Sequence, residues 1–67
     1  MRITMRAART NAGLTQEEAS KQLGISEVTL RNWESGRSAP RASKIPDICR
    51  AYKCSVENLI FFENKLR

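Results

Sequence analysis

Residues 15–36 carry the signals of two short helices separated by a tight turn, and few folds accommodate that arrangement. Thr15 is an N-cap candidate, and Glu18 stands three residues later in the capping-box position. Gly24 ends the first helix, because glycine readily adopts the positive φ of a helix C-cap. Ser26 is a second N-cap candidate. Two helices of about two turns each, joined by a glycine-containing turn of about 3–4 residues, form a helix-turn-helix pattern.

The second of these helices, which ends at Gly36, has two different faces. At about 100° per residue, Leu30 and Trp33 share one face, and Val28 and Asn32 each point roughly 160° away from Leu30. The apolar face can pack against the first helix, so Trp33 is expected in the core. An ordinary amphipathic surface helix has the same layout, and the pattern alone leaves both interpretations open. In a helix-turn-helix, the second helix enters the DNA major groove.

From about Met5 to Ile60 the chain resembles the phage-repressor and Cro type of helix-turn-helix domain. The motifs that carry the resemblance are Leu14-Thr15-Gln16, Ala19-Ser20, Gly24, and Leu30 followed by Glu34-x-Gly36. The resemblance implies an all-α, five-helix, lambda-repressor-like DNA-binding domain. Ala19 stands where the family usually has Leu, and Ser20 where it usually has Ala. These two departures thin the core and place a hydroxyl at a close helix contact, so we expect modest stability.

The composition is that of one small basic domain, residues 1–67. Twelve Lys and Arg against seven Asp and Glu give a net charge of +5, and the pI is about 9.9. Such a balance favours a polyanionic partner, here double-stranded DNA, although charges spread for solubility have the same effect on the total. A chain of this length buries a modest core, so a homodimer on DNA is expected to help its stability.

The sequence contains no apolar run long enough to span a membrane, and no apolar segment follows Met1 to Arg6 as in a signal peptide. The expected location is therefore the cytoplasm. Cys49 and Cys54 are the only cysteines and the chain has no His, so a tetrahedral zinc site is not expected. A disulfide between the two is possible, but reduced, half-buried thiols are favoured. No cofactor is expected.

A first helix is predicted over residues 3–12, with Met5, Ala8 and Ala12 facing inward. By family resemblance, Arg9 lies opposite Glu34 and forms a mostly buried structural ion pair. Arg2 and Arg6, on the same helix, are assigned to a solvated face.

The second half of the chain is predicted as a basic loop, residues 37–43, and two further helices. Arg37, Arg41 and Lys44 either grip phosphates or form a solvated surface. The fourth helix spans residues 44–52 with Pro46 in its first turn. Lys53 stands where the family usually has a helix-ending Gly, so a strained or shifted cap is expected.

Ser55 is predicted to cap a short fifth helix with Val56, Leu59 and Ile60 inward. No strand of useful length is expected. In the tail, residues 61–67, two interpretations stay open: one Phe forms a dimer contact with Leu66, or one Phe packs at the edge of the domain and the tail frays.

DNA recognition requires phosphate contacts for position and base contacts for specificity. Along the recognition helix, residues 26–35, Glu27 can accept from cytosine N4, Val28 can meet a thymine methyl and Asn32 can pair with adenine. An equal interpretation of Glu27 is a favourable charge at a helix N-terminus. Arg31 reaches a guanine or a phosphate. Phosphate contacts are expected from Gln16, by family resemblance, and from Ser35, Arg37 and Arg41.

The chain lacks the residues of an enzyme, with no His, no nucleophile beside a base and no Gly-rich phosphate loop. The sequence therefore predicts a sequence-specific DNA-binding transcriptional regulator, a dimeric repressor of the Cro type that binds operator DNA. Two alternatives remain. One is the antitoxin of a toxin–antitoxin pair, which would bind a protein partner and its own promoter. The other is a protein-interaction module that does not bind DNA.

Overall fold

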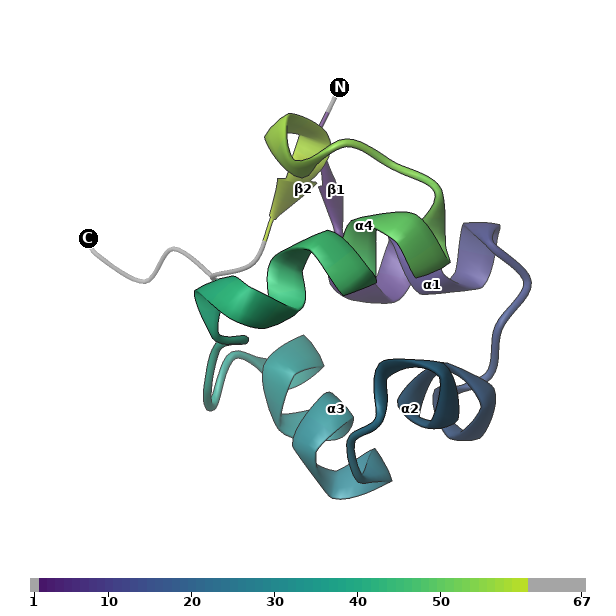
Figure 1. Ribbon diagram of the computed structural model, residues 1–67, viewed down its shortest axis with the longest axis vertical. Coiled ribbons are helices and arrows are strands. Elements are labelled where there is room, and N and C mark those ends of the chain that lie inside the picture. Colours follow the sequence, from purple (N-terminus) through teal and green to yellow (C-terminus); the bar gives the residue numbers. More distant parts are fainter. Residues whose placement is uncertain (1, 61–67) are drawn as a thin grey trace.

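The computed structural model describes residues 2–60, which form a bundle of short helices whose two ends meet in a pair of strands (Figure 1). The helices α1 and α4 lie over α2 and α3, and the strand pair stands beside α1 (Figure 1). In chain order the elements are β1 (Ile3–Thr4), α1 (Met5–Asn11), α2 (Gln16–Leu23), α3 (Glu27–Ser35), the 3-10 turn η1 (Ala42–Lys44), α4 (Ile45–Tyr52), the 3-10 turn η2 (Val56–Asn58) and β2 (Leu59–Ile60).

Side-chain caps start the first three helices. The hydroxyl of Thr4 accepts from the N–H of Ala7 at the start of α1, and Ser26 accepts from Thr29 at the start of α3. At α2 the expected capping box is confirmed, because Thr15 and Glu18 each accept from the other's backbone N–H. The helix predicted from residue 3 begins instead at Met5, because Ile3 and Thr4 are extended and pair with another segment.

All four helices end with a residue in the left-handed conformation, and in each the next N–H bonds back to a carbonyl five residues earlier. Glycine occupies the first three ends, with φ of 79°, 70° and 86° at Gly13, Gly24 and Gly36. The fourth end is Lys53, at φ 56°. The four closing hydrogen bonds run from Leu14 to Arg9 (3.1 Å), Ile25 to Ser20 (3.0 Å), Arg37 to Asn32 (2.9 Å) and Cys54 to Cys49 (3.1 Å).

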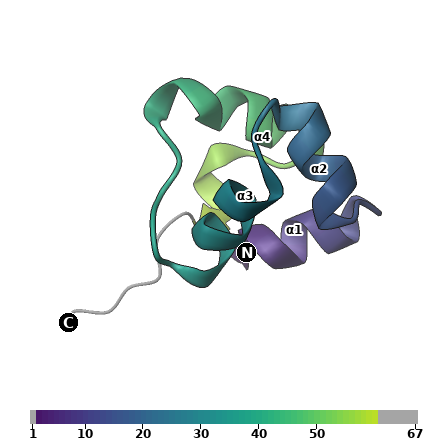
Figure 2. The ribbon, with the colours of Figure 1, turned by 90° about the horizontal axis from the view of Figure 1, so that it is seen from below.

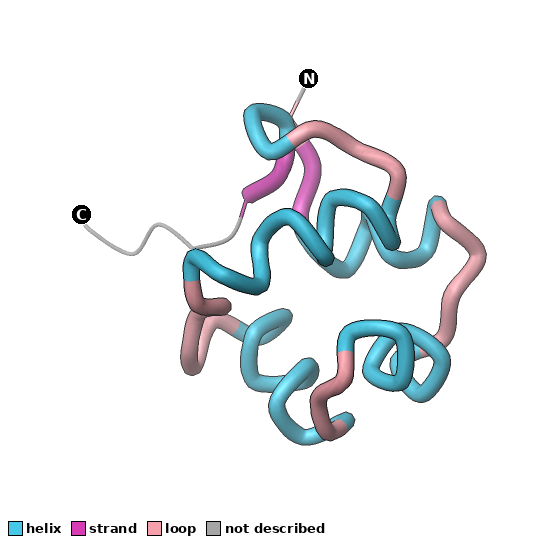
Figure 3. Tube along the Cα trace, viewed as in Figure 1, coloured by secondary structure: helices cyan, strands magenta, loops and turns pink. Residues whose placement is uncertain are grey.

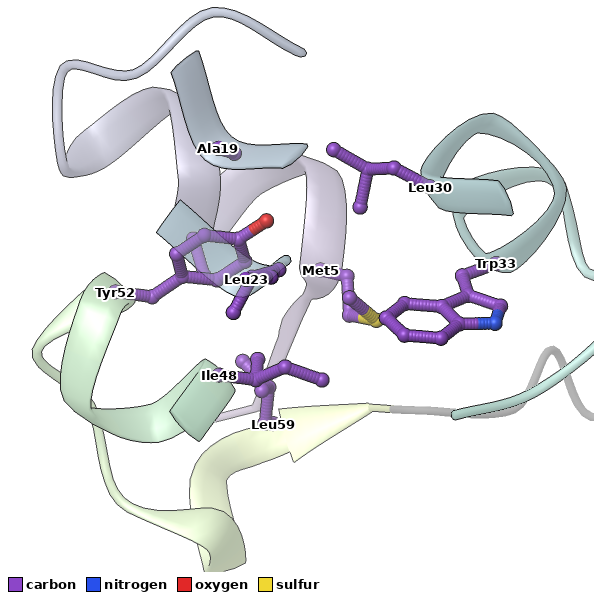
Figure 4. Close-up of a cluster of buried hydrophobic side chains, with 9 residues drawn as sticks. Met5, Ala19, Leu23, Leu30, Trp33, Ile48, Tyr52 and Leu59 are labelled. Atoms are coloured by element: carbon purple, nitrogen blue, oxygen red, sulfur yellow. The ribbon is translucent and has the colours of Figure 1, made fainter. Parts of the chain in front are cut away.

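The core lies where the four helices meet and includes residues from every one of them (Figure 4). Leu30 and Ile48 are completely enclosed, and Trp33 is buried on the face of α3 that it shares with Leu30, as predicted. Ala19 is fully buried and the Ser20 hydroxyl donates to the carbonyl of Glu17 at 2.9 Å, so this buried polar group is satisfied. The remaining core side chains belong to Met5, Ala8, Leu23, Tyr52 and Leu59.

The predicted fifth helix is wrong, and residues 2–60 contain four α-helices. Residues 56–58 form the 3-10 turn η2, and the strand β2 follows it. Ser55 makes no capping bond to the backbone, and its hydroxyl accepts instead from the Asn58 amide. Val56, expected inward, has 51% of its surface exposed, whereas Leu59 is buried at 4%.

Strand β2 exists because it has a partner from the other end of the chain. It pairs in parallel with β1, with Ile3 opposite Leu59 and Thr4 opposite Ile60, as the magenta segments of Figure 3 show. The pairing satisfies backbone groups that would otherwise need water or a continued helix. The sequence predicted no strand of useful length, and each of these two strands has only two residues. The tail contact expected from a Phe and Leu66 lies outside the described residues.

Candidate nucleic-acid interface

The outward face of α3 carries polar and apolar side chains that no other element covers. Glu27, Val28 and Arg31 are exposed, with 58% of the Val28 surface accessible, and Asn32 is half-buried. Viewed from below, α3 projects from the molecule beside α2 (Figure 2). Ser26 is the N-cap of this helix and not its first residue. The four side chains predicted to contact bases therefore lie on one helix, and three of them are open to solvent.

Two of these side chains form an exposed ion pair. The Arg31 Nη2 atom lies 4.0 Å from Glu27 Oε1, one helical turn away. Both side chains are largely exposed, so the pair contributes little to stability and opens at low cost. The pair therefore holds neither side chain firmly in place.

The C-terminal end of α3 is tied to α1 by the expected ion pair of Arg9 and Glu34. Arg9 donates to both carboxylate oxygens, with Nε 2.7 Å from Oε2 and Nη2 3.3 Å from Oε1. Its third donor, Nη1, bonds the Leu14 carbonyl at 2.9 Å. Only 1% of the Glu34 side chain is exposed. Removal of Arg9 would therefore take from the buried carboxylate two hydrogen bonds and its nearest positive charge.

Gln16, expected at a phosphate, is also part of this buried cluster. Its Nε2 atom donates to Glu34 Oε1 at 3.0 Å, so the first residue of α2 is bonded to the end of α3. A side-chain amide nitrogen carries two hydrogens, and one of them remains for a further acceptor. Sequence reasoning missed this bond, because Gln16 and Glu34 are brought together only by the packing of α2 on α3.

The basic loop after α3 has two exposed arginines and a buried anchor. Arg37 and Arg41 are exposed near its two ends, and Pro40 between them is buried, so the proline packs as well as breaking the helix. The Ser35 hydroxyl donates to the Asn32 carbonyl at 3.2 Å. Ser35, Arg37 and Arg41 are all exposed and follow the outward face of α3 along the chain.

Lys44, counted with the loop arginines from the sequence, has a different contact. Its Nζ donates to the Leu23 carbonyl at 2.7 Å, at the end of α2. A cation at a helix C-terminus satisfies an otherwise unpaired carbonyl and complements the helix dipole. The Lys44 side chain therefore ties η1 to the turn of the motif. The predicted fourth helix starts at Ile45, one residue later than expected, with η1 before it.

Tyr52 is a buried polar side chain that sequence reasoning placed only by its apolar spacing. Its hydroxyl is enclosed and has no hydrogen-bond partner among the described residues. Burial, and next the negative charge of Glu34, raise the pKa of Tyr52 to about 12, against an opposing effect of Arg9. The phenol is therefore held neutral beside the ion pair.

Cys49 and Cys54 are free and half-buried, as expected. Burial, and next the neighbouring Cys49, raise the pKa of the Cys54 thiol. Within residues 2–60, no three His, Cys, Asp or Glu side chains are placed together to hold a metal. No helix in that part of the chain has the length and apolar character needed to cross a membrane.

Comparison with known proteins agrees with this geometry. Residues 5–59 match the family model described as helix-turn-helix. An HTH-type transcriptional regulator of Archaeoglobus fulgidus is 31% identical over 65 residues, covering 97% of this chain and 93% of its own. A second regulator of that organism is 26% identical over 65 residues, covering 97% and 92%. The HTH-type transcriptional activator BcrR of Enterococcus faecalis is 31% identical over 52 residues, 78% of this chain and 26% of BcrR.

No solved structure matches the chain at the significance that these relatives reach. The chain belongs to the helix-turn-helix family of DNA-binding transcriptional regulators, in the phage-repressor and Cro type that its motifs indicated. Its members are regulators and not enzymes, in agreement with the missing catalytic residues.

Proposed function

We propose that this protein is a repressor of transcription that binds operator DNA as a homodimer and reads its sequence with α3. The observation that carries the proposal is the outward face of that helix. Glu27, Val28 and Arg31 are exposed there while Leu30 and Trp33 of the same helix are enclosed. A helix whose apolar face is packed on the domain can enter the major groove with its exposed face towards the bases.

Each outward side chain matches a base edge. Glu27 accepts from a cytosine amine, Val28 contacts a thymine methyl group, and Asn32 pairs with adenine through two hydrogen bonds. Arg31 reaches a guanine or a phosphate once its ion pair with Glu27 opens. Bidentate contacts of this kind are each worth about 1–3 kcal/mol of discrimination.

The remaining contacts position the protein on the duplex. Gln16 at the start of α2 and Ser35, Arg37 and Arg41 after the recognition face bind phosphates. Gln16 does so with its second amide hydrogen while its first holds Glu34. Gln16 therefore links the contact with a DNA phosphate to Glu34 at the end of α3.

Dimerisation and repression are further parts of the proposal. A two-fold dimer presents two recognition helices to half-sites about 34 Å apart, near one helical turn of DNA. Occupancy of such an operator is sufficient to exclude polymerase. The whole chain acts as one domain, residues 1–67, in the cytoplasm, where it meets duplex DNA.

Selection of binding sites from random duplex DNA tests the proposal. The selected sequence should be two-fold symmetric, and log affinity should fall linearly with log salt with a slope of about −0.9 per neutralised phosphate. Asn32→Ala should cost about 1–3 kcal/mol and relax the preference at one base pair of each half-site. Arg37→Ala should weaken all sequences alike and lower the salt slope by about one.

The opposite pattern, with Arg37→Ala changing the selected sequence and Asn32→Ala leaving it intact, would show that the two roles are reversed. Absence of binding to any duplex at low salt would reject the function. Sedimentation of the protein with and without the selected duplex measures the dimer, and a promoter-reporter assay separates repression from activation.

A further inference from the structure

The charges around Glu34 do not cancel. Arg9 and Gln16 hold its two oxygens with three hydrogen bonds. A second guanidinium, that of Arg6, lies near the same carboxylate, with its Nε 3.9 Å from Oε1. That distance is too long for a hydrogen bond. One carboxylate facing two guanidinium groups leaves one positive charge in excess, and the outermost group, Arg6, carries it.

Arg6 is open to solvent at this position. Its side chain is 71% exposed, in contrast to 12% for Arg9 one turn along α1. Because Arg6 Nε and Gln16 Nε2 both lie within 4 Å of one oxygen atom, they share one edge of the molecule. At that edge α1 packs on α3, and Gln16 is the first residue of α2.

We infer that Arg6 binds a phosphate of duplex DNA beside the phosphate bound by Gln16, which extends the interface from the motif onto α1. The inference rests on the proposed function. A guanidinium fits a phosphate with two parallel hydrogen bonds, and the terminal nitrogens of Arg6 make no hydrogen bond within the described residues. The Arg6 guanidinium makes no hydrogen bond to Glu34 at 3.9 Å and is itself largely in water, so it leaves the buried carboxylate at small cost.

Glu34 stays paired when Arg6 turns to DNA, because Arg9 and Gln16 remain bonded to it. The contact therefore adds affinity without loosening the junction of α1 and α3. Sequence analysis assigned Arg6 to a solvated face, since its position opposite Glu34 arises only from the packing of α1 on α3. The one available signal was its spacing of three residues from Arg9, on the same side of a helix.

The test compares Arg6→Gln with a matched control. Arg50→Gln removes the same charge from an exposed arginine of α4, whose guanidinium bonds Asp47 at 3.1 Å. Binding of each protein to a labelled duplex of mixed sequence is followed by fluorescence anisotropy over a series of KCl concentrations. Arg6→Gln should make the slope of log affinity against log salt shallower by about 0.9 per bound chain, and Arg50→Gln should leave it unchanged.

Two further measurements separate DNA contact from structural support. Arg6→Lys should keep most of the slope, because it retains the charge, and Arg6→Gln should keep the thermal midpoint of the wild type. Equal slopes for Arg6→Gln and Arg50→Gln would overturn the inference and leave the proposed function standing. A fall in the thermal midpoint with an unchanged slope would assign Arg6 to structure instead. A wild type that binds no duplex at low salt would overturn the function and this inference together.

Discussion

The ends of α3 and α4 share one backbone arrangement but differ in the residue that adopts it. Gly36 closes α3 at φ 86° and Lys53 closes α4 at φ 56°. Glycine enters the left-handed region freely, whereas a residue with a Cβ does so at a cost of about 1–2 kcal/mol. At α3 the local sequence is sufficient to end the helix. At α4 the surrounding packing must impose the turn.

The packing that imposes it is visible on both sides of Lys53. Tyr52 before it and Leu59 after it are both buried, and the chain must reverse between them to place both in the core. Strand β2 then reaches β1 (Figure 3). The comparison suggests that residues 16–36 are specified mainly by local signals and residues 53–60 mainly by distant ones.

The largest effect is expected at the buried ion pair between α1 and α3. Local caps start and end these helices, but the ion pair holds them together. Arg9→Met should lower the free energy of unfolding by about 3–5 kcal/mol, because the buried Glu34 carboxylate would lose the guanidinium that bonds both its oxygens. Replacing both, as in Arg9→Met with Glu34→Leu, should cost much less. Denaturant unfolding of the two single variants and the double variant measures the coupling. Strict additivity would mean that the two residues do not interact.

The second effect tests the strand that replaced the predicted helix. Leu59→Ala should lower the free energy of unfolding by about 2–5 kcal/mol, because it opens a cavity in the core. Val56→Ala, at the exposed position three residues earlier, should change it by about 0.5 kcal/mol or less. Similar losses at both positions would instead fit a helix with both side chains inward. Chemical denaturation of the two variants decides between them.

The third effect is a pH dependence at the end of α4. The pKa of Tyr52 rises from 10.0 to about 12 on folding, so the folded state holds its proton more tightly than the unfolded state. Its contribution to stability is complete below pH 10 and is lost as the pH rises towards about 12. By linkage this loss amounts to about 2–3 kcal/mol.

Tyr52→Phe supplies the control, because it cannot ionise and removes an unpaired buried hydroxyl. Its unfolding free energy below pH 10 should be equal to or higher than that of the wild type. Between pH 10 and 12 the unfolding free energy of Tyr52→Phe should fall less than that of the wild type, because the variant lacks the loss that comes from ionisation of Tyr52. Parallel stability curves for the two proteins would show that Tyr52 does not couple to folding.

The smallest effect addresses the comparison of helix ends directly. Lys53→Gly should raise the free energy of unfolding by about 1 kcal/mol, because it relieves the left-handed strain. Gly13→Ala makes the opposite change, because it places a Cβ at the left-handed residue that ends α1. Its new Cβ would meet no atom within 4 Å, so its loss should come from the positive φ alone. Thermal melts that show no gain at Lys53 would mean that the packing around α4 compensates the strain.

The accuracy of the sequence predictions follows the range of the interactions involved. Three features were predicted correctly: the capping box of Thr15, the helix end at Gly24 and the inward face of Leu30 and Trp33. Each of them depends on residues within a few positions along the chain. The fifth helix was predicted wrongly. A local cap signal at Ser55 was outweighed by the pairing of Leu59 with Ile3 from the far end.

The sequence by itself determined the ends of the three helices that close with glycine, the buried face of α3 and the net basic charge of the chain. Tertiary structure alone decided the bond from Gln16 to Glu34, the placement of Arg6 beside that carboxylate and the diversion of Lys44 to the Leu23 carbonyl. The physical reason is range. Helix caps and periodic faces are set by neighbours along the chain, whereas a charge finds its partner only after separate helices have packed.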